Sequence, residues 1–244
     1  MVCKRNRYAP SEQYRGNNIG REFVPQIMKR FAAAITLSAG LFAQAQRAPE
    51  RTVHGTILIS DQSPPIRIAL PTNAKYLGAD RWPLHGVADC EVHLWVEADT
   101  NKVVSKLYWV QFEAYLPSHP ESRYNYPFKQ TTNIGGFDFD VRARFGPTNS
   151  PPKPESDGAH VRALLEKAGY KWPPEMMNVR FVHVPDEKKR TELMIIYAED
   201  LHPTGVKAAE LEPGGKASAQ WSALEQGLIE RASQKLQLSR PSSR

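Results

Sequence analysis

The chain of 244 residues lacks the short motifs that identify the commonest enzyme classes. It contains no G-x-S-x-G elbow, no G-x-x-x-x-G-K-[ST] loop, no G-x-G-x-x-G turn and no H-E-x-x-H pair. These absences disfavour serine hydrolases with the elbow, P-loop enzymes, dinucleotide-binding enzymes and zinc proteases of the H-E-x-x-H class. An unconventional catalytic triad stays open, because triads are defined by geometry and not by spacing.

Cysteine is nearly absent as well, since the sequence has only Cys3 and Cys90. Cys3 precedes a predicted export signal, so Cys90 is the single cysteine of the predicted mature chain. An internal disulfide and a cysteine-rich structural zinc site are therefore excluded from that chain. We interpret Cys90 as a small buried apolar residue and not as a nucleophile.

The chain from Gln46 onward has almost no net charge. The formal net charge is +6, but seven basic residues face two acidic ones before Gln46, which leaves the remainder at +1. We therefore expect no nucleic-acid partner for the folded part. The early segment is typical of an export signal, because Lys29 and Arg30 precede a short apolar run and Ala43-Gln44-Ala45 forms a small-x-small cleavage site.

These features divide the chain into three parts. We interpret residues 1–45 as an upstream segment with an export signal, in which residues 28–45 are a signal peptide that is removed. Residues 46–238 are interpreted as one globular α+β domain and residues 239–244 as a disordered tail. The predicted location is periplasmic or secreted. The apolar run is too short for a stable membrane span, which needs about 20 residues.

The strongest structural pattern runs from Glu91 to Leu116 and predicts a long β-hairpin. Apolar residues recur at every second position, and Asp99 to Asn101 interrupt them. Further strands are predicted at 52–60, 66–70, 137–145, 179–184 and 191–199, helices at 157–167 and 218–236, and irregular segments at 73–89 and 117–136. The strand at 191–199 contains four consecutive apolar residues, so we expect it to be central and buried on both faces. Gly169 directly after the first helix is expected to end it. The sum is an α+β protein with a mainly antiparallel sheet of about six to eight strands, built on long β-hairpins, with one inserted and one C-terminal helix.

One face of the second hairpin strand carries polar groups among bulky apolar ones. Gln111 and Glu113 alternate there with Trp109 and Tyr115. We place His93 of the partner strand on the same face. Desolvation by aromatic walls would raise the pKa of Glu113 and suit it to acid–base catalysis, with His93 as its partner. The alternative is a half-wet face whose polar groups are solvated.

The irregular segment 117–136 is rich in tyrosine. Tyr124 and Tyr126 would either stack on a ligand such as a sugar ring or anchor the loop to its own domain. The predicted catalytic residues are thus Glu113 and His93, and the predicted substrate-binding residues are Trp109, Gln111, Tyr115, Tyr124 and Tyr126.

Asp138 and Asp140 are weak candidates for a metal site. Two residues apart on a strand, their carboxylates point the same way and could hold calcium if a third oxygen joined them. Arg142 and Arg144 continue the same face, which favours cross-strand ion pairing instead. The sequence therefore predicts no cofactor and leaves a divalent cation such as calcium open.

Two functions agree with these patterns. The first is an exported hydrolase of small esters, lactones or glycosides that uses Glu113 and His93 for proton transfer. The second is a non-catalytic secreted or periplasmic module that binds a ligand on its aromatic face. Both have a small molecule as the expected partner, and the sequence indicates no oligomeric state.

Overall fold

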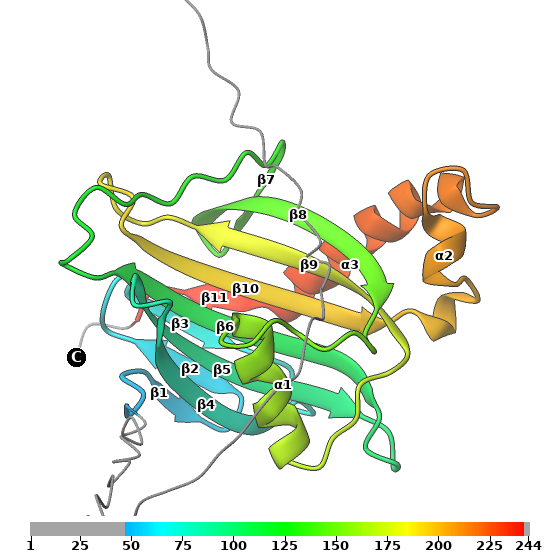
Figure 1. Cartoon of the computed structure of the whole chain (residues 1–244), viewed down its shortest axis with the longest axis horizontal. Coiled ribbons are helices and arrows are strands. Elements are labelled where there is room, and N and C mark those ends of the chain that lie inside the picture. The colour runs from blue at the N-terminus through cyan, green and yellow to red at the C-terminus, as the bar shows by residue number, and fades with distance from the viewer. Residues whose placement is uncertain (1–46, 242–244) are drawn as a thin grey trace, which may run out of the picture. The chain divides into compact units, whose positions relative to one another are not determined.

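The computed structural model describes residues 47–241, and the predicted signal peptide lies outside this range. The fold is α+β, as predicted, and its strands form two antiparallel sheets (Figure 1). The larger sheet contains, in spatial order, β4 (Lys75–Leu84), β5 (Ala88–Ala98), β6 (Val104–Tyr115), β10 (Thr191–Asp200), β9 (Glu175–His183), β8 (Phe137–Pro147) and β7 (Gln130–Ile134). The smaller sheet contains β1 (Thr52–His54), β2 (Ile57–Ser60), β3 (Ile66–Ala69) and β11 (Gln237–Ser239).

Helices connect and cover the two sheets. Their bounds are α1 (Asp157–Lys167), α2 (Ala208–Leu211) and α3 (Trp221–Lys235), with 3-10 turns η1 (His202–Thr204) and η2 (Ser218–Gln220). Helix α1 ends as its sequence predicts, since Gly169 follows the C-cap Ala168 with a φ of +76°, which glycine adopts without strain. Within residues 47–241 no helix is long and apolar enough to span a bilayer.

The predicted hairpin is confirmed as β5 and β6. Asp99 shapes its turn, because the carboxylate accepts hydrogen bonds from the backbone N–H groups of Asn101 and Val103 at 2.9 and 2.8 Å. Strand β10 pairs with β6 on one side and β9 on the other, so it lies at the centre of the larger sheet. Its run from Leu193 to Ile195 is buried on both faces, as the unbroken apolar pattern predicts.

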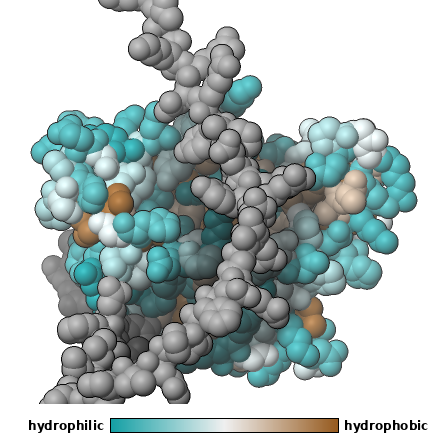
Figure 2. Space-filling view, in the orientation of Figure 1, coloured by the Kyte–Doolittle hydropathy of each residue, from teal (hydrophilic) through white to brown (hydrophobic). Residues whose placement is uncertain are grey.

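The two faces of the larger sheet have different covers. The inner face carries Tyr108, Val110 and Phe112 of β6 and packs against the smaller sheet and α3. The opposite face, here called the α1 face, packs in part against Val161 and Leu165 of α1. Figure 1 shows α1 in front of this sheet and α3 with the smaller sheet behind it. On the side that Figure 2 shows, the visible surface of the described residues is largely hydrophilic, and apolar side chains form small separate groups.

The prediction that residues 73–89 are irregular is wrong, because this segment contains β4. Gly78 and Pro83 obscured the strand pattern. Both are tolerated because β4 is an edge strand, where a missing N–H leaves no partner unpaired and where a bulge between Tyr76 and Gly78 shifts the register.

Three further boundaries differ from the prediction. The strand predicted at 52–60 is a hairpin of β1 and β2 that turns at Gly55, whose φ is +62°. The loop predicted at 117–136 contains β7. The predicted start of the C-terminal tail, at residue 239, is too early, because Ser239 belongs to β11 and pairs with Arg67. In each case the pairing partner is distant or the strand is too short to show a periodic pattern.

Candidate functional site

The strand register separates the two residues predicted to be catalytic. Cys90 lies opposite Glu113, whereas His93 lies opposite Val110. Cross-strand partners share a face of the sheet, and Cys90 and His93 are an odd number of residues apart. Glu113 therefore lies on the α1 face and His93 on the inner face. The predicted Glu113–His93 acid–base pair is wrong, because the sheet itself stands between the two side chains.

The other predicted residues of β6 do come together, in a row of hydrogen bonds on the α1 face. The indole Nε1 of Trp109 donates to Gln111 Oε1 at 2.7 Å, and Gln111 Nε2 donates to Glu113 Oε1. The hydroxyl of Tyr124 donates to Glu113 Oε2 at 3.3 Å. Gln111 is fully buried and Glu113 is 8% exposed, so the row is part of the interior and not a half-wet face.

Glu192 of β10 extends the row, because it lies directly opposite Glu113. It is fully buried, accepts a hydrogen bond from the Tyr126 hydroxyl and lies 3.7 Å from Arg180 Nη2. Burial, and then the charge of Glu113, raises the pKa of Glu192 to about 8. Burial and the nearby Asp157 raise the pKa of Glu113 as well. Sequence analysis missed Glu192, whose cross-strand partner is remote in the chain.

The tyrosine-rich loop is held on this face by stacked rings. The Tyr115 and Tyr124 centroids are 4.3 Å apart, and the Tyr126 ring follows at 6.4 Å from Tyr124. Phe128 packs next to Tyr126 at 5.3 Å, and the Arg180 guanidinium lies 5.1 Å from the Tyr126 centroid. Tyr124 is 6% exposed. Of the two roles considered for these tyrosines, the contacts support anchoring of the loop.

A cavity of about 320 Å³ lies on the α1 face beside Trp109. It is flanked by β6, β8, β9 and β10. Two of its polar lining residues, Arg144 and Asn178, lie directly opposite each other on β8 and β9. The apolar part of its wall includes Leu107, Trp109, Trp172, Met176, Ile196 and Ala198.

A second cavity, of about 390 Å³, lies at the other end of the same face. Tyr124 and Tyr126 line it together with the two weak metal candidates, Asp138 and Asp140. Asp138 accepts a hydrogen bond from Asn133 Nδ2 at 2.7 Å, and neither aspartate forms an ion pair with another described residue. The cross-strand ion pairing expected for them is therefore not seen within residues 47–241.

A different group of side chains has the spacing of a metal-ligand set. The ligand atoms of Cys90, Glu113 and Asp157 lie within 4.8 Å of one another. Burial and the two carboxylates raise the pKa of the Cys90 thiol, and the thiol forms a hydrogen bond with Glu113. Cys90 is fully buried, as its interpretation as a small apolar residue requires.

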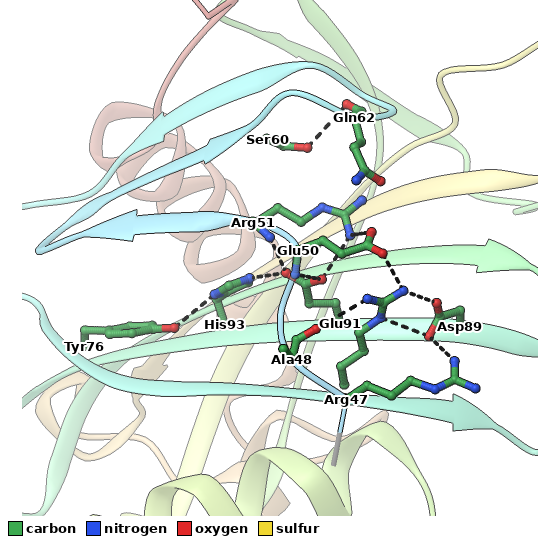
Figure 3. A network of polar contacts seen from close by, with 11 residues as sticks. Arg47, Ala48, Glu50, Arg51, Ser60, Gln62, Tyr76, Asp89, Glu91 and His93 are labelled. Carbon is green, nitrogen blue, oxygen red and sulfur yellow. Dashed lines mark hydrogen bonds and ion pairs between the residues drawn. The ribbon is translucent and has the colours of Figure 1, made fainter. Parts of the chain in front are cut away.

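His93 belongs to a separate polar network on the inner face (Figure 3). Its Nδ1 shares a hydrogen bond of 3.0 Å with the Tyr76 hydroxyl, and its Nε2 lies 2.8 Å from Glu91 Oε1. Glu91 also accepts hydrogen bonds from the backbone N–H groups of Glu50 and Arg51, at 2.8 and 3.0 Å, and from the Arg51 guanidinium at 3.1 Å.

This network fixes the start of the described chain to β5. Burial alone would raise the pKa of Glu91, but the hydrogen bonds from His93, Glu50 and Arg51 outweigh it and lower the pKa to about 2. His93 and Glu91 are each 1% exposed. Their position gives them a structural role in holding the N-terminal segment.

The chain was compared with models of protein families, with curated proteins and with solved structures. None of the three comparisons finds a match.

Proposed function

We propose that the protein is a non-catalytic module that binds a small molecule in the cavity beside Trp109. The observation that carries this proposal is the cavity itself. Its volume of about 320 Å³ and its mainly apolar wall with a few polar groups match the general properties of small-molecule sites. We propose further that the module works in the periplasm or outside the cell, which rests on the signal pattern at 28–45.

The buried polar row supports a positioning role rather than catalysis. Trp109 donates to Gln111, Gln111 donates to Glu113, and Tyr124 donates to the second oxygen of Glu113. Each group in the row is engaged by its neighbour. This arrangement fixes the orientation of the Trp109 ring, which forms part of the cavity wall.

The test is binding of a neutral apolar fluorophore, N-phenyl-1-naphthylamine, to the protein from Gln46 onward. We expect saturable binding that weakens at least tenfold in Trp109→Ala, because the substitution removes a large part of the apolar wall. Trp82→Phe is the control, since Trp82 is a buried tryptophan that does not line this cavity. Equal weakening in both variants, with both still folded, would contradict the assignment of the site.

A hydrolase of small esters, lactones or glycosides is the second candidate, favoured by the Glu113–Glu192 pair. The two carboxyl groups lie opposite each other, and the pKa of each is raised. Paired carboxyl groups with unequal protonation serve as acid and base in several hydrolase classes. Turnover of chromogenic substrates that disappears in both Glu113→Gln and Glu192→Gln would support this candidate, and turnover that survives either substitution would exclude it.

A further inference from the structure

The cavity beside Trp109 is lined by an arginine that pairs with no described carboxylate. The Arg144 guanidinium has no hydrogen bond, ion pair or ring contact within the part of the chain that the structure describes. The Asn178 amide adds a further donor opposite Arg144. Among the described residues that line the cavity, none is Asp or Glu.

The charge around Arg144 is also not balanced locally. Arg142 precedes it on the same face of β8, and Arg180 lies opposite Arg142 on β9. Partial burial, and then these two like charges, lowers the pKa of Arg144. Arg142 lies over the ring of Phe128 and Arg180 over that of Tyr126, so both are engaged elsewhere. Arg144 is the member of this group that lines the cavity, and it is exposed to solvent there.

We propose that the ligand of this cavity is an organic carboxylate with an apolar or aromatic body, whose carboxylate pairs with Arg144. The inference rests on the proposed binding function and names the class of its ligand. A guanidinium presents two parallel N–H donors that match a carboxylate, and the Asn178 amide lies within the same pair of strands. The body of the ligand packs between Trp109 and the aliphatic wall, which leaves the charged end at the solvent-exposed arginine.

The experiment compares two ligands that differ in the charged group alone. 4-Phenylbutyrate and 4-phenyl-1-butanol compete with N-phenyl-1-naphthylamine on the protein from Gln46 onward at low ionic strength. We expect the carboxylate to bind about tenfold more tightly than the alcohol, because charge-assisted hydrogen bonds are stronger than neutral ones. We expect Arg144→Met to abolish this preference and to leave the affinity for the alcohol nearly unchanged.

Arg142→Met is the matched control. It removes the same charge as Arg144→Met, only two residues away on the same strand, but the Arg142 side chain does not line the cavity. A preference that disappears equally in both variants would reduce the effect to general electrostatics and overturn the role of Arg144. Equal binding of acid and alcohol, with a Trp109-dependent fluorophore signal, would overturn the ligand class and leave the binding function standing. If neither the fluorophore nor either competitor binds, the result would refute both the proposed binding function and the proposed carboxylate ligand.

Discussion

The substitution Glu192→Gln is the most informative single change. Glu192 is fully buried, and its pKa is raised from 4.5 to about 8 in the folded protein. In the unfolded chain the carboxyl group ionises near 4.5, whereas in the folded chain it keeps its proton until about pH 8. The stability that this proton provides is fully present below pH 4.5 and is lost as the pH rises through 8.

The magnitude follows from the difference between the two pKa values. One unit corresponds to about 1.4 kcal/mol, so the free energy of unfolding decreases by up to about 5 kcal/mol between pH 4.5 and 8. Glutamine matches the protonated carboxyl in shape and can still accept the hydrogen bond of Tyr126. We therefore expect Glu192→Gln to be near neutral at pH 5 and to be more stable than wild type by about 3 kcal/mol at pH 8.

Urea unfolding from pH 5 to pH 9 measures this difference directly. Glu121→Gln serves as the control, because Glu121 is an exposed carboxylate in the loop that precedes Tyr124. Its stability curve should run parallel to that of wild type, whereas the Glu192→Gln curve should diverge upward above pH 5. Parallel curves for wild type and Glu192→Gln would refute the reasoning, since they would mean that Glu192 is ionised in the folded protein at neutral pH.

Three further substitutions test other parts of the structure. Glu91→Gln should destabilise the protein by about 2–4 kcal/mol at pH 7 and make the chain near Arg51 susceptible to proteolysis. The pKa of Glu91 is lowered to about 2, so its contribution to stability is present above pH 4.5 and is lost as the pH falls toward 2. Gly135→Ala should lower the melting temperature by more than Gly136→Ala does, because both residues have a positive φ but a Cβ on Gly135 would lie 2.1 Å from the carbonyl oxygen of Leu238. If turnover of any substrate is detected, His93→Gln should lower stability and leave kcat unchanged, since His93 lies on the inner face; a loss of kcat in a folded variant would contradict that assignment.

Local periodicity predicted the elements whose apolar pattern is long and uninterrupted. The alternation from Glu91 to Leu116 predicted the β5–β6 hairpin, whose strands are joined by a turn in which the Asp99 carboxylate accepts hydrogen bonds from two backbone N–H groups. The unbroken apolar run of β10 indicated a central strand because such a run needs cover on both faces. The same reasoning failed at β4, where the interruptions at Gly78 and Pro83 are compatible with an edge strand but are typical of a loop.

In the candidate site, the positions of residues within one strand could be predicted from the sequence, but contacts between strands could not. Trp109, Gln111 and Glu113 lie on one strand, so their common face follows from parity alone. Whether His93 shares that face depends on the register between two strands, and a change of one residue in register moves a side chain to the other face. The pairing of Glu113 with Glu192 depends on a contact between distant strands, which no pattern within a single strand contains.

The two polar networks of the larger sheet differ in how their charge is balanced, and this difference separates their roles. Glu91 on the inner face is surrounded by donors, which lower its pKa and make the ion a fixed part of the fold. Glu113 and Glu192 on the α1 face oppose each other, and the pKa of each is raised, so one proton between them relieves the repulsion. A network of the first kind holds its segment at any pH well above 2. We expect the second kind to respond to pH above the usual range of a carboxyl group, because the pKa values of both glutamates are raised. Through Gln111 it is joined to Trp109 and to the cavity that we propose as the ligand site.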